Sequence, residues 1–215
     1  MIQYFHQHQS QILSWLGWHA RLSALPLVIG LLISLPLGWL ARRYRWLYPP
    51  MVSVAGLLYT IPSLALFILL PGILKTRILD PSNVVVALTI YTVALLVRVV
   101  ADGLASVSDE VLQAATAMGY RRLGRLLRIE LPIAVPVIAA GLRVAAVSNV
   151  SLVSVSALIG VPELGQLFTN GFQLAYQTPI LLGIVLSVLL ALAFDSVIQL
   201  LTWLLTPWRR VVSPA

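Results

Sequence analysis

The chain has 215 residues, of which 60% are hydrophobic and only 10% are charged, and this composition excludes a soluble globular protein. The net charge of +7 does not indicate a nucleic-acid partner, because the arginines cluster beside apolar runs, where the positive-inside rule explains them. The absence of Cys excludes disulfides, thiolate metal sites and cysteine nucleophiles.

The first residues, 1–21, are predicted to form a short interfacial helix on the outer side of a membrane. Trp15 and Trp18 suit the headgroup level, and no Lys or Arg precedes Arg21, so the positive start of a secretory signal is missing. His6 and His8 have no carboxylate neighbours in the sequence, which favours polar surface over metal ligation. No metal site is predicted.

About five apolar intervals follow, each long enough to cross the roughly 30 Å hydrocarbon core as a helix. They predict an all-α membrane protein with a transmembrane domain over residues 22–210 and a short tail at 211–215. Pro26 and Pro36 interrupt the first interval, and Pro62 lies near the middle of the second. The expected spans are 22–41, one within 46–74, 83–100, 133–158 and 179–205.

The longest charged stretch, 109–132, lies between two apolar intervals, so it must leave the membrane and return. Ser108 can cap a helix that has Asp109 and Glu110 in its first turn. Gly119 can adopt the left-handed conformation that ends such a helix. An apolar face of this helix suits insertion into a partner's groove. That face consists of Leu112, Ala115 and Met118, with the small Ala114 beside it.

The same stretch resembles the cytoplasmic signature of the permease subunits of bacterial ABC importers. That signature reads Glu-Ala-Ala, three residues, Gly, nine residues, Ile, one residue, Leu-Pro, and this chain departs from it only in having Gln at the first position. The matching residues are Gln113, Ala114, Ala115, Gly119, Ile129, Leu131 and Pro132. In that family the segment is the coupling helix that docks on the ATPase, so the resemblance implies an ATPase contact here, including Glu110 and Met118. An ordinary interfacial helix is the alternative.

The resemblance further implies a type I ABC importer permease fold, similar to that of methionine importers, in a bacterial inner membrane. It implies ATPase subunits, a second permease subunit that is identical or related, and an extracytoplasmic substrate-binding protein as partners. ATP and magnesium would bind to the ATPase, with no cofactor on this chain. Lys75 is the only lysine and no glycine-rich run precedes it, so a phosphate-binding loop is excluded and no enzyme activity is expected.

The distribution of Lys and Arg predicts the orientation, with the N-terminus outside and the C-terminus in the cytoplasm. If the signature faces the cytosol, the outer side holds only Arg21, Lys75 and Arg77. The cytosolic side then holds Arg42, Arg43, Arg45, Arg121, Arg122, Arg125, Arg128, Arg209 and Arg210, with Arg98 and Arg143 at span ends.

Three further runs, 35–38, 60–65 and 160–167, are similar to permeases for glycine betaine, choline, carnitine and related osmoprotectants. A permease for methionine or another amino acid has the same size and is the alternative. An ion-coupled secondary transporter and a membrane assembly factor without transport activity also stay open.

Polar residues inside two spans are candidates for the translocation path. Pro62 frees backbone groups that need partners or a water-filled cavity, so Tyr59, Thr60 and Ser63 beside it could line a path. Ser148 and Asn149 in the fourth span are further candidates. Ordinary packing between helices is the alternative for each of them.

Charged residues within spans are costly unless they are paired or hydrated. Asp195 is the deepest of them, and Arg143 and Arg98 lie toward the cytoplasmic ends of their spans. A pair of Asp195 with Arg143 or Arg98 that locks helices together is favoured over a proton relay, because no further titratable group is near in the sequence.

Overall fold

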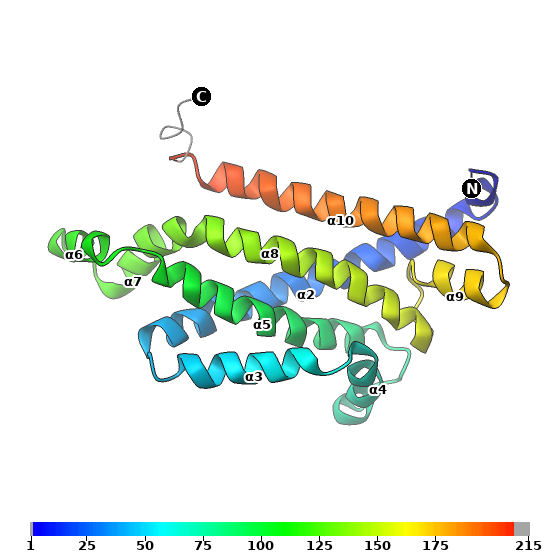
Figure 1. Cartoon of the computed structure of the whole chain (residues 1–215), viewed down its shortest axis with the longest axis horizontal. Helices are drawn as coiled ribbons and strands as arrows, with labels where there is room; N and C mark the ends of the chain where they lie inside the picture. The colour runs from blue at the N-terminus through cyan, green and yellow to red at the C-terminus, as the bar shows by residue number, and fades with distance from the viewer. Residues whose placement is uncertain (1, 209–215) are drawn as a thin grey trace.

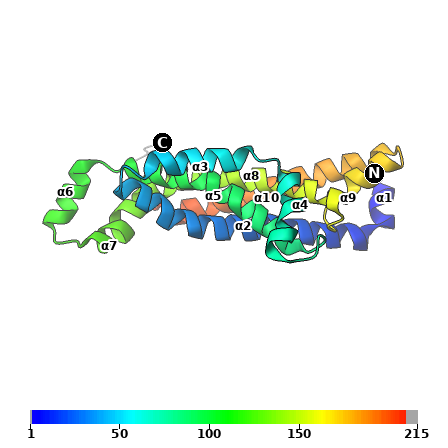
Figure 2. The same cartoon turned by 90° about the horizontal axis from the view of Figure 1, so that it is seen from below.

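The computed structural model describes residues 2–208, and all its regular elements in that range are helical. Figure 1 shows an elongated bundle in which the long helices run nearly side by side, and Figure 2 shows the same bundle from below. The elements are α1 (Ile2–Gln7), α2 (Gln9–Arg43), α3 (Tyr48–Thr60), α4 (Ser63–Leu74), α5 (Pro81–Ala105), α6 (Asp109–Ala117), α7 (Arg122–Arg125), a π-helical turn (Leu126–Glu130), α8 (Leu131–Val153), a 3₁₀ helix (Ser154–Ile159), α9 (Gln166–Gln173) and α10 (Gln177–Leu205).

Four helical stretches in the described residues are long and apolar enough to cross a membrane, and the bent pair α3–α4 makes a fifth if it counts as one span. This agrees with the expected all-α membrane fold of about five spans. The four are α2, α5, the continuous stretch Arg122–Ile159 and α10.

The first span differs from its prediction, because one helix of 35 residues begins at Gln9 and includes most of the segment assigned to an interfacial helix. Pro26 and Pro36 lie inside this helix and do not end it. Neighbouring helices can satisfy the backbone groups that a proline frees within a span. The expected boundary between residues 21 and 22 is therefore wrong as a helix boundary.

The second span is broken where a single kinked helix was expected. The axes of α3 and α4 differ by 99°, and the break contains Ile61 and Pro62 in extended conformation. Proline disfavours helical geometry in the residue before it, which explains why the helix stops at Thr60. The Tyr91 hydroxyl of α5 donates a hydrogen bond to the Ile61 carbonyl, so a backbone group freed at the break is satisfied.

The fourth span also begins earlier than expected. Residues 122–159 form one continuous helical stretch, so the arginine-rich run before Leu131 is an extension of the span and no separate amphipathic helix. Pro132 lies directly after the π-helical turn and does not end the helical stretch.

Helix α5 is the centre of the bundle and packs against α2, α3, α4 and α8. Its start is capped by Asp80, whose Oδ1 accepts a hydrogen bond from the Ser82 N–H at 2.9 Å, and this bond lowers the pKa of Asp80. Helix α2 lies close to α5 because Gly38 has no side chain. A Cβ added at Gly38 would lie 2.6 Å from the Cβ of Val100.

The two ends of the bundle carry different small elements. Helices α6 and α7 project from one end, while α1, α9 and the N-terminus lie at the other, and the C-terminal end of α10 is on the α6 side (Figures 1 and 2). The predicted charges Arg209 and Arg210 and the tail 211–215 lie outside the described residues.

Candidate coupling segment and translocation face

Helix α6 is the projecting element, and its start follows the predicted capping pattern. The Oγ of Ser108 accepts a hydrogen bond from the Val111 N–H at 3.5 Å, while Asp109 and Glu110 occupy the first turn. Carboxylates are favoured there because the N-terminal end of a helix carries partial positive charge. The sequence pattern therefore forms a capped helix that extends beyond the bundle.

The end of α6 is fixed by Gly119, which has a φ of +84°. The Gly119 N–H bonds to the Thr116 carbonyl at 3.0 Å, and the Tyr120 N–H bonds to the Ala115 carbonyl at 3.1 Å. These two bonds form a Schellman motif, which satisfies the last carbonyls of a helix and needs a left-handed residue. The expected left-handed stop at Gly119 is confirmed, and it fixes the direction in which the chain leaves α6.

The residues of the predicted partner-binding face are not equally accessible. Met118 is 69% exposed, whereas Ala115 is 1% exposed and Leu112 is half-buried. Ala115 therefore packs against its own chain, and its predicted part in coupling to the ATPase stays a prediction. Of the residues in this segment that are predicted to contact the ATPase, the exposed ones are Glu110, Gln113, Ala114, Met118 and Gly119, and we call these the exposed face of α6.

The last part of the signature lies in and after the π-helical turn. Ile129 is in that turn and half-buried, and Leu131 and Pro132 are half-buried in the first turn of α8. These three residues join the projecting segment to the span. Their position supports α6 and does not form part of its exposed face.

Arg125 and Glu130 form a brace at this turn that sequence reasoning did not identify. The Arg125 Nε donates to the Glu130 Oε1 at 2.8 Å, and its Nη1 donates to the Thr116 Oγ1 at 2.9 Å. Backbone hydrogen bonds in a π-helical turn join residues i and i+5, and Arg125 and Glu130 flank this turn at that separation. The pair thus ties α6 to the beginning of the fourth span.

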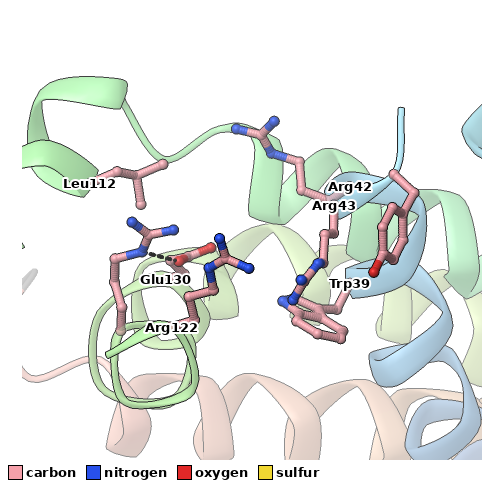
Figure 3. A pocket seen from close by; sticks show the side chains of 8 residues that line it. Trp39, Arg42, Arg43, Leu112, Arg122 and Glu130 are labelled. Carbon is pink, nitrogen blue, oxygen red and sulfur yellow. Dashed lines mark hydrogen bonds and ion pairs between the residues drawn. The ribbon is translucent and has the colours of Figure 1, made fainter. Parts of the chain in front are cut away.

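A cavity of about 520 Å³ lies between these elements and the end of α2, and Figure 3 shows the side chains that line it. Leu112 of α6 lies on one side of the view, Trp39 and Arg43 of α2 lie on the other, and Arg122 and Glu130 lie between them. The cavity is therefore formed between the end of α2 and the segment that runs from α6 to the π-helical turn.

The polar residues around Pro62 lie on the outer surface of the broken span. Tyr59 is 44% exposed and packs edge-on against Tyr91, with ring centroids 5.6 Å apart. Thr60 is exposed but donates its hydroxyl hydrogen bond to the Leu57 carbonyl, and Ser63 is half-buried at the start of α4. Tyr59 also lines a hollow of about 320 Å³ between α3 and α5, which includes Arg98.

Asn149 does not line a path in this structure, because it is 2% exposed inside the bundle. Its Nδ2 donates to the Thr92 Oγ1 at 3.1 Å and to the Ser23 carbonyl at 3.4 Å, which links α8 to α5 and α2. These contacts support the packing alternative for Asn149. Its neighbour Ser148 is half-buried.

Asp195 of α10 pairs with Arg143 of α8. The Arg143 Nε and Nη2 donate to the two carboxylate oxygens at 2.5 and 2.9 Å, and Gln199 donates to one of them as well. Arg98 does not join this pair and lies 3.5 Å from Asp102 one turn along α5, so its expected role as an alternative partner is wrong. The two-point contact holds α10 against α8.

A buried His–Glu pair at the opposite end of the bundle was not predicted from the sequence. The His19 Nδ1 lies 2.8 Å from the Glu163 Oε2, both side chains are 0% exposed, and the His19 Nε2 lies 2.9 Å from the Val150 carbonyl. The Gly165 N–H donates to the same Glu163 oxygen at 2.6 Å. We call these three side-chain and backbone partners, His19, Glu163 and Gly165, the α9-end clamp, because they fix the loop before α9 to α2.

The described residues contain no group of three or more His, Cys, Asp or Glu side chains that could bind a metal ion. His6 is exposed, and the His8 Nδ1 lies 3.1 Å from the Tyr4 carbonyl. The candidate functional site consists of the projecting helix α6, the arginine-lined cavity beside it and the bundle of spans.

Comparison with known proteins supports the same interpretation. Residues 12–203 match the family described as the binding-protein-dependent transport system inner membrane component. The osmoprotectant import permease protein OsmW of Salmonella typhimurium is 32% identical over 208 residues, covering 96% of this chain and 97% of that protein. The glycine betaine/carnitine/choline permease OpuCD of Bacillus subtilis is 28% identical, covering 96% of this chain and 90% of that protein.

Among solved structures, an inward-facing MetNI methionine ABC transporter superposes with a TM-score of 0.76 at 18% identity, covering 90% of this chain and 97% of that one. This likeness shows the fold. Together with the family match over nearly the whole chain, it decides against a secondary transporter or an assembly factor. The chain therefore belongs to the binding-protein-dependent transport system inner membrane component family and is the non-catalytic permease subunit of an ABC importer.

Proposed function

We propose that this permease carries osmoprotectants of the quaternary ammonium class, such as glycine betaine, carnitine or choline. The observation that carries the proposal is the 32% identity to an osmoprotectant import permease over almost the full length of both chains. Other relatives of similar coverage are named for choline and carnitine transport. The methionine transporter shares the fold at 18% identity, and that likeness supports no shared substrate.

The hollow between α3 and α5 suits this substrate class. It combines the exposed Tyr59 ring with the Arg98 side chain, which is 65% exposed. An aromatic face attracts a quaternary ammonium group, and a guanidinium pairs with a carboxylate. A zwitterion such as glycine betaine has both groups. We therefore place the translocation path along this surface, with Thr60, Pro62 and Ser63 at its bend and Ser148 as a further candidate.

The permease is proposed to lie with its N-terminus outside and the α6 end in the cytoplasm. In that orientation the arginines at the α6 end follow the positive-inside rule. The exposed face of α6 would dock on the ATPase, and a second permease subunit would complete the path. Rigid-body movement of α6 and the span it joins would then transmit the ATPase closure.

Uptake by proteoliposomes containing the permease, its ATPase and its binding protein tests the substrate. We expect ATP-dependent uptake of labelled glycine betaine that unlabelled choline or carnitine reduces and that methionine in large excess leaves unchanged. Uptake inhibited by methionine and indifferent to all three osmoprotectants would overturn the proposal and favour an amino-acid importer.

A further inference from the structure

We propose that the cavity at the α6 end binds the phosphate group of an anionic phospholipid. The inference depends on the chain spanning a membrane, and it is independent of the transported substrate. Four arginines and one glutamate line this cavity, which gives it three uncompensated positive charges. The lining arginines are Arg42, Arg43, Arg122 and Arg125.

The charge is available to a ligand, because only one of these arginines has a carboxylate partner among residues 2–208. Arg125 binds Glu130, whose side chain is 10% exposed. Within residues 2–208, no carboxylate oxygen lies within 4.0 Å of the nitrogens of Arg42, Arg43 or Arg122. A guanidinium offers a rigid fork of donors that fits two oxygens of a phosphate, so three unpaired forks around one cavity suit a phosphate group.

The guanidinium of Arg43, one of the three unpaired groups, is already held in place by aromatic rings. The Arg43 Cζ lies 5.3 Å from the centroid of the Trp39 ring and 5.2 Å from that of Tyr44. Both rings line the cavity as well. Contact with aromatic faces limits the freedom of the arginine side chain, which lowers the entropy that binding would cost.

The position of the cavity relative to the membrane favours a lipid over a soluble phosphate. It lies at the last turn of the first span, where Arg42 and Arg43 end α2 and Trp39 precedes them. Trp and Tyr in membrane proteins gather at the headgroup level, and basic pockets between spans on the cytoplasmic side bind anionic headgroups. The volume of about 520 Å³ is in the range of small-molecule sites.

A phosphate bound in the cavity would connect α2 and α7, which have few contacts with each other. A phosphate between Arg43 of α2 and Arg122 of α7 would bridge the first span to the base of the coupling segment. The lipid would thereby act as a fixed support beneath α6. An acidic surface of the ATPase is the competing occupant, and the test separates the two.

The test compares phospholipid retention by the permease–ATPase complex purified from vesicles of phosphatidylcholine with phosphatidylglycerol. Native mass spectrometry counts the retained phosphatidylglycerol. The triple variant R42Q/R43Q/R122Q removes the three unpaired forks, and R45Q/R121Q/R128Q removes the same charge from exposed arginines outside the cavity. We expect at least a tenfold loss of retention in the first variant and less than a twofold change in the second.

Two further arms identify the occupant. Inorganic phosphate and soluble glycerol phosphate should not displace the lipid at matched concentration, and adding the ATPase to lipid-loaded permease should leave retention unchanged. The single variant R43K keeps the charge and loses the fork, so it should give an intermediate loss even if the triple variant fails to fold. Equal loss in both triple variants, displacement by the soluble phosphates, or displacement by the ATPase would overturn the proposal.

Discussion

At the α6 end of the bundle short helices project beyond the spans (Figure 1), whereas at the α9 end a buried His–Glu pair joins a loop to the first span. The brace between Arg125 and Glu130 has side-chain exposures of 27% and 10%, and Met118 nearby is 69% exposed. At the other end His19 and Glu163 are both 0% exposed.

This difference suggests that the α9 end stabilises the fold, whereas the α6 end serves coupling. A segment with few buried contacts opens locally at little cost, while a fully buried polar network resists opening. Changes at the α9-end clamp should therefore reduce the stability of the fold, and changes at α6 should reduce coupling to the ATPase while the fold persists. The predictions below test this contrast, beginning with the largest expected effect.

Glu163→Ala should give the largest loss of stability, because it leaves the His19 ring and the Gly165 N–H buried without their partner. Removing one member of a buried pair of this kind costs about 3–5 kcal/mol. Denaturant unfolding of the purified permease measures the loss. Glu130→Ala at the opposite end is the matched control and should cost clearly less. Equal losses at both ends would remove the contrast.

Gly119→Val should reduce coupling without preventing membrane insertion. No heavy atom lies within 4 Å of a Cβ added at Gly119, so the cost arises from its positive φ alone. A left-handed residue with a side chain costs about 1–2 kcal/mol, and 1.4 kcal/mol corresponds to a tenfold change in an equilibrium. ATPase stimulation by the permease should fall about tenfold.

The control for Gly119 is Gly124→Val, in which the added Cβ meets only Tyr120 Cδ1, at 3.9 Å, and the glycine has no positive φ. It should keep most of the stimulation. Equal stimulation by the two variants would show that the Schellman stop is irrelevant to docking.

Asp195→Asn should lower the yield of folded, assembled complex more than it changes substrate preference. The substitution weakens the two-point contact with Arg143 that holds α10 against α8. Arg98→Gln is the comparison, since Arg98 lies in the proposed path and its partner Asp102 is only one turn away. It should raise the apparent KM for glycine betaine with little change in yield. A well-folded Asp195→Asn complex with altered specificity would contradict this assignment.

Gln113→Glu should have the smallest effect. The new carboxylate would enter a hollow of about 370 Å³ that Gln113 shares with Asp109 and Arg125, where it would compete weakly with Glu130. Exposed ion pairs contribute about 0–1 kcal/mol, so the apparent affinity for the ATPase should change by less than about fivefold. Titration of ATPase stimulation measures it, and a complete loss would indicate that the amide makes a specific contact.

The capped helix of the coupling segment could be predicted from the sequence because the residues that determine its conformation act on nearby backbone groups. Ser108 and Gly119 act on backbone groups within a few positions, and their residue types alone indicate the conformations required. The signature spacing then identified the family. The π-turn was missed because nothing local in Leu126–Glu130 distinguishes it from an α-helical turn.

The α9-end clamp could not be predicted, because His19 and Glu163 are 144 positions apart and no local pattern links them. The His residues near the N-terminus were interpreted by their neighbours in sequence, which said nothing of a partner across the bundle. The break at Pro62 was located correctly, but its 99° angle depends on how α4 packs beneath α5. A polar residue within an expected apolar helix, His19, and a carboxylate in the glycine-rich loop, Glu163, were the available signals.

Crosslinking from the two ends tests the central claim most directly. The chain contains no Cys, so the variants Gln113→Cys on α6 and Phe172→Cys on α9 each provide a single reactive site. We predict that Gln113→Cys crosslinks to the ATPase subunit in native membranes and that Phe172→Cys, which is 83% exposed at the opposite end, does not. Crosslinking from Phe172→Cys, or labelling of Gln113→Cys by an impermeant maleimide added outside intact cells, would contradict the account.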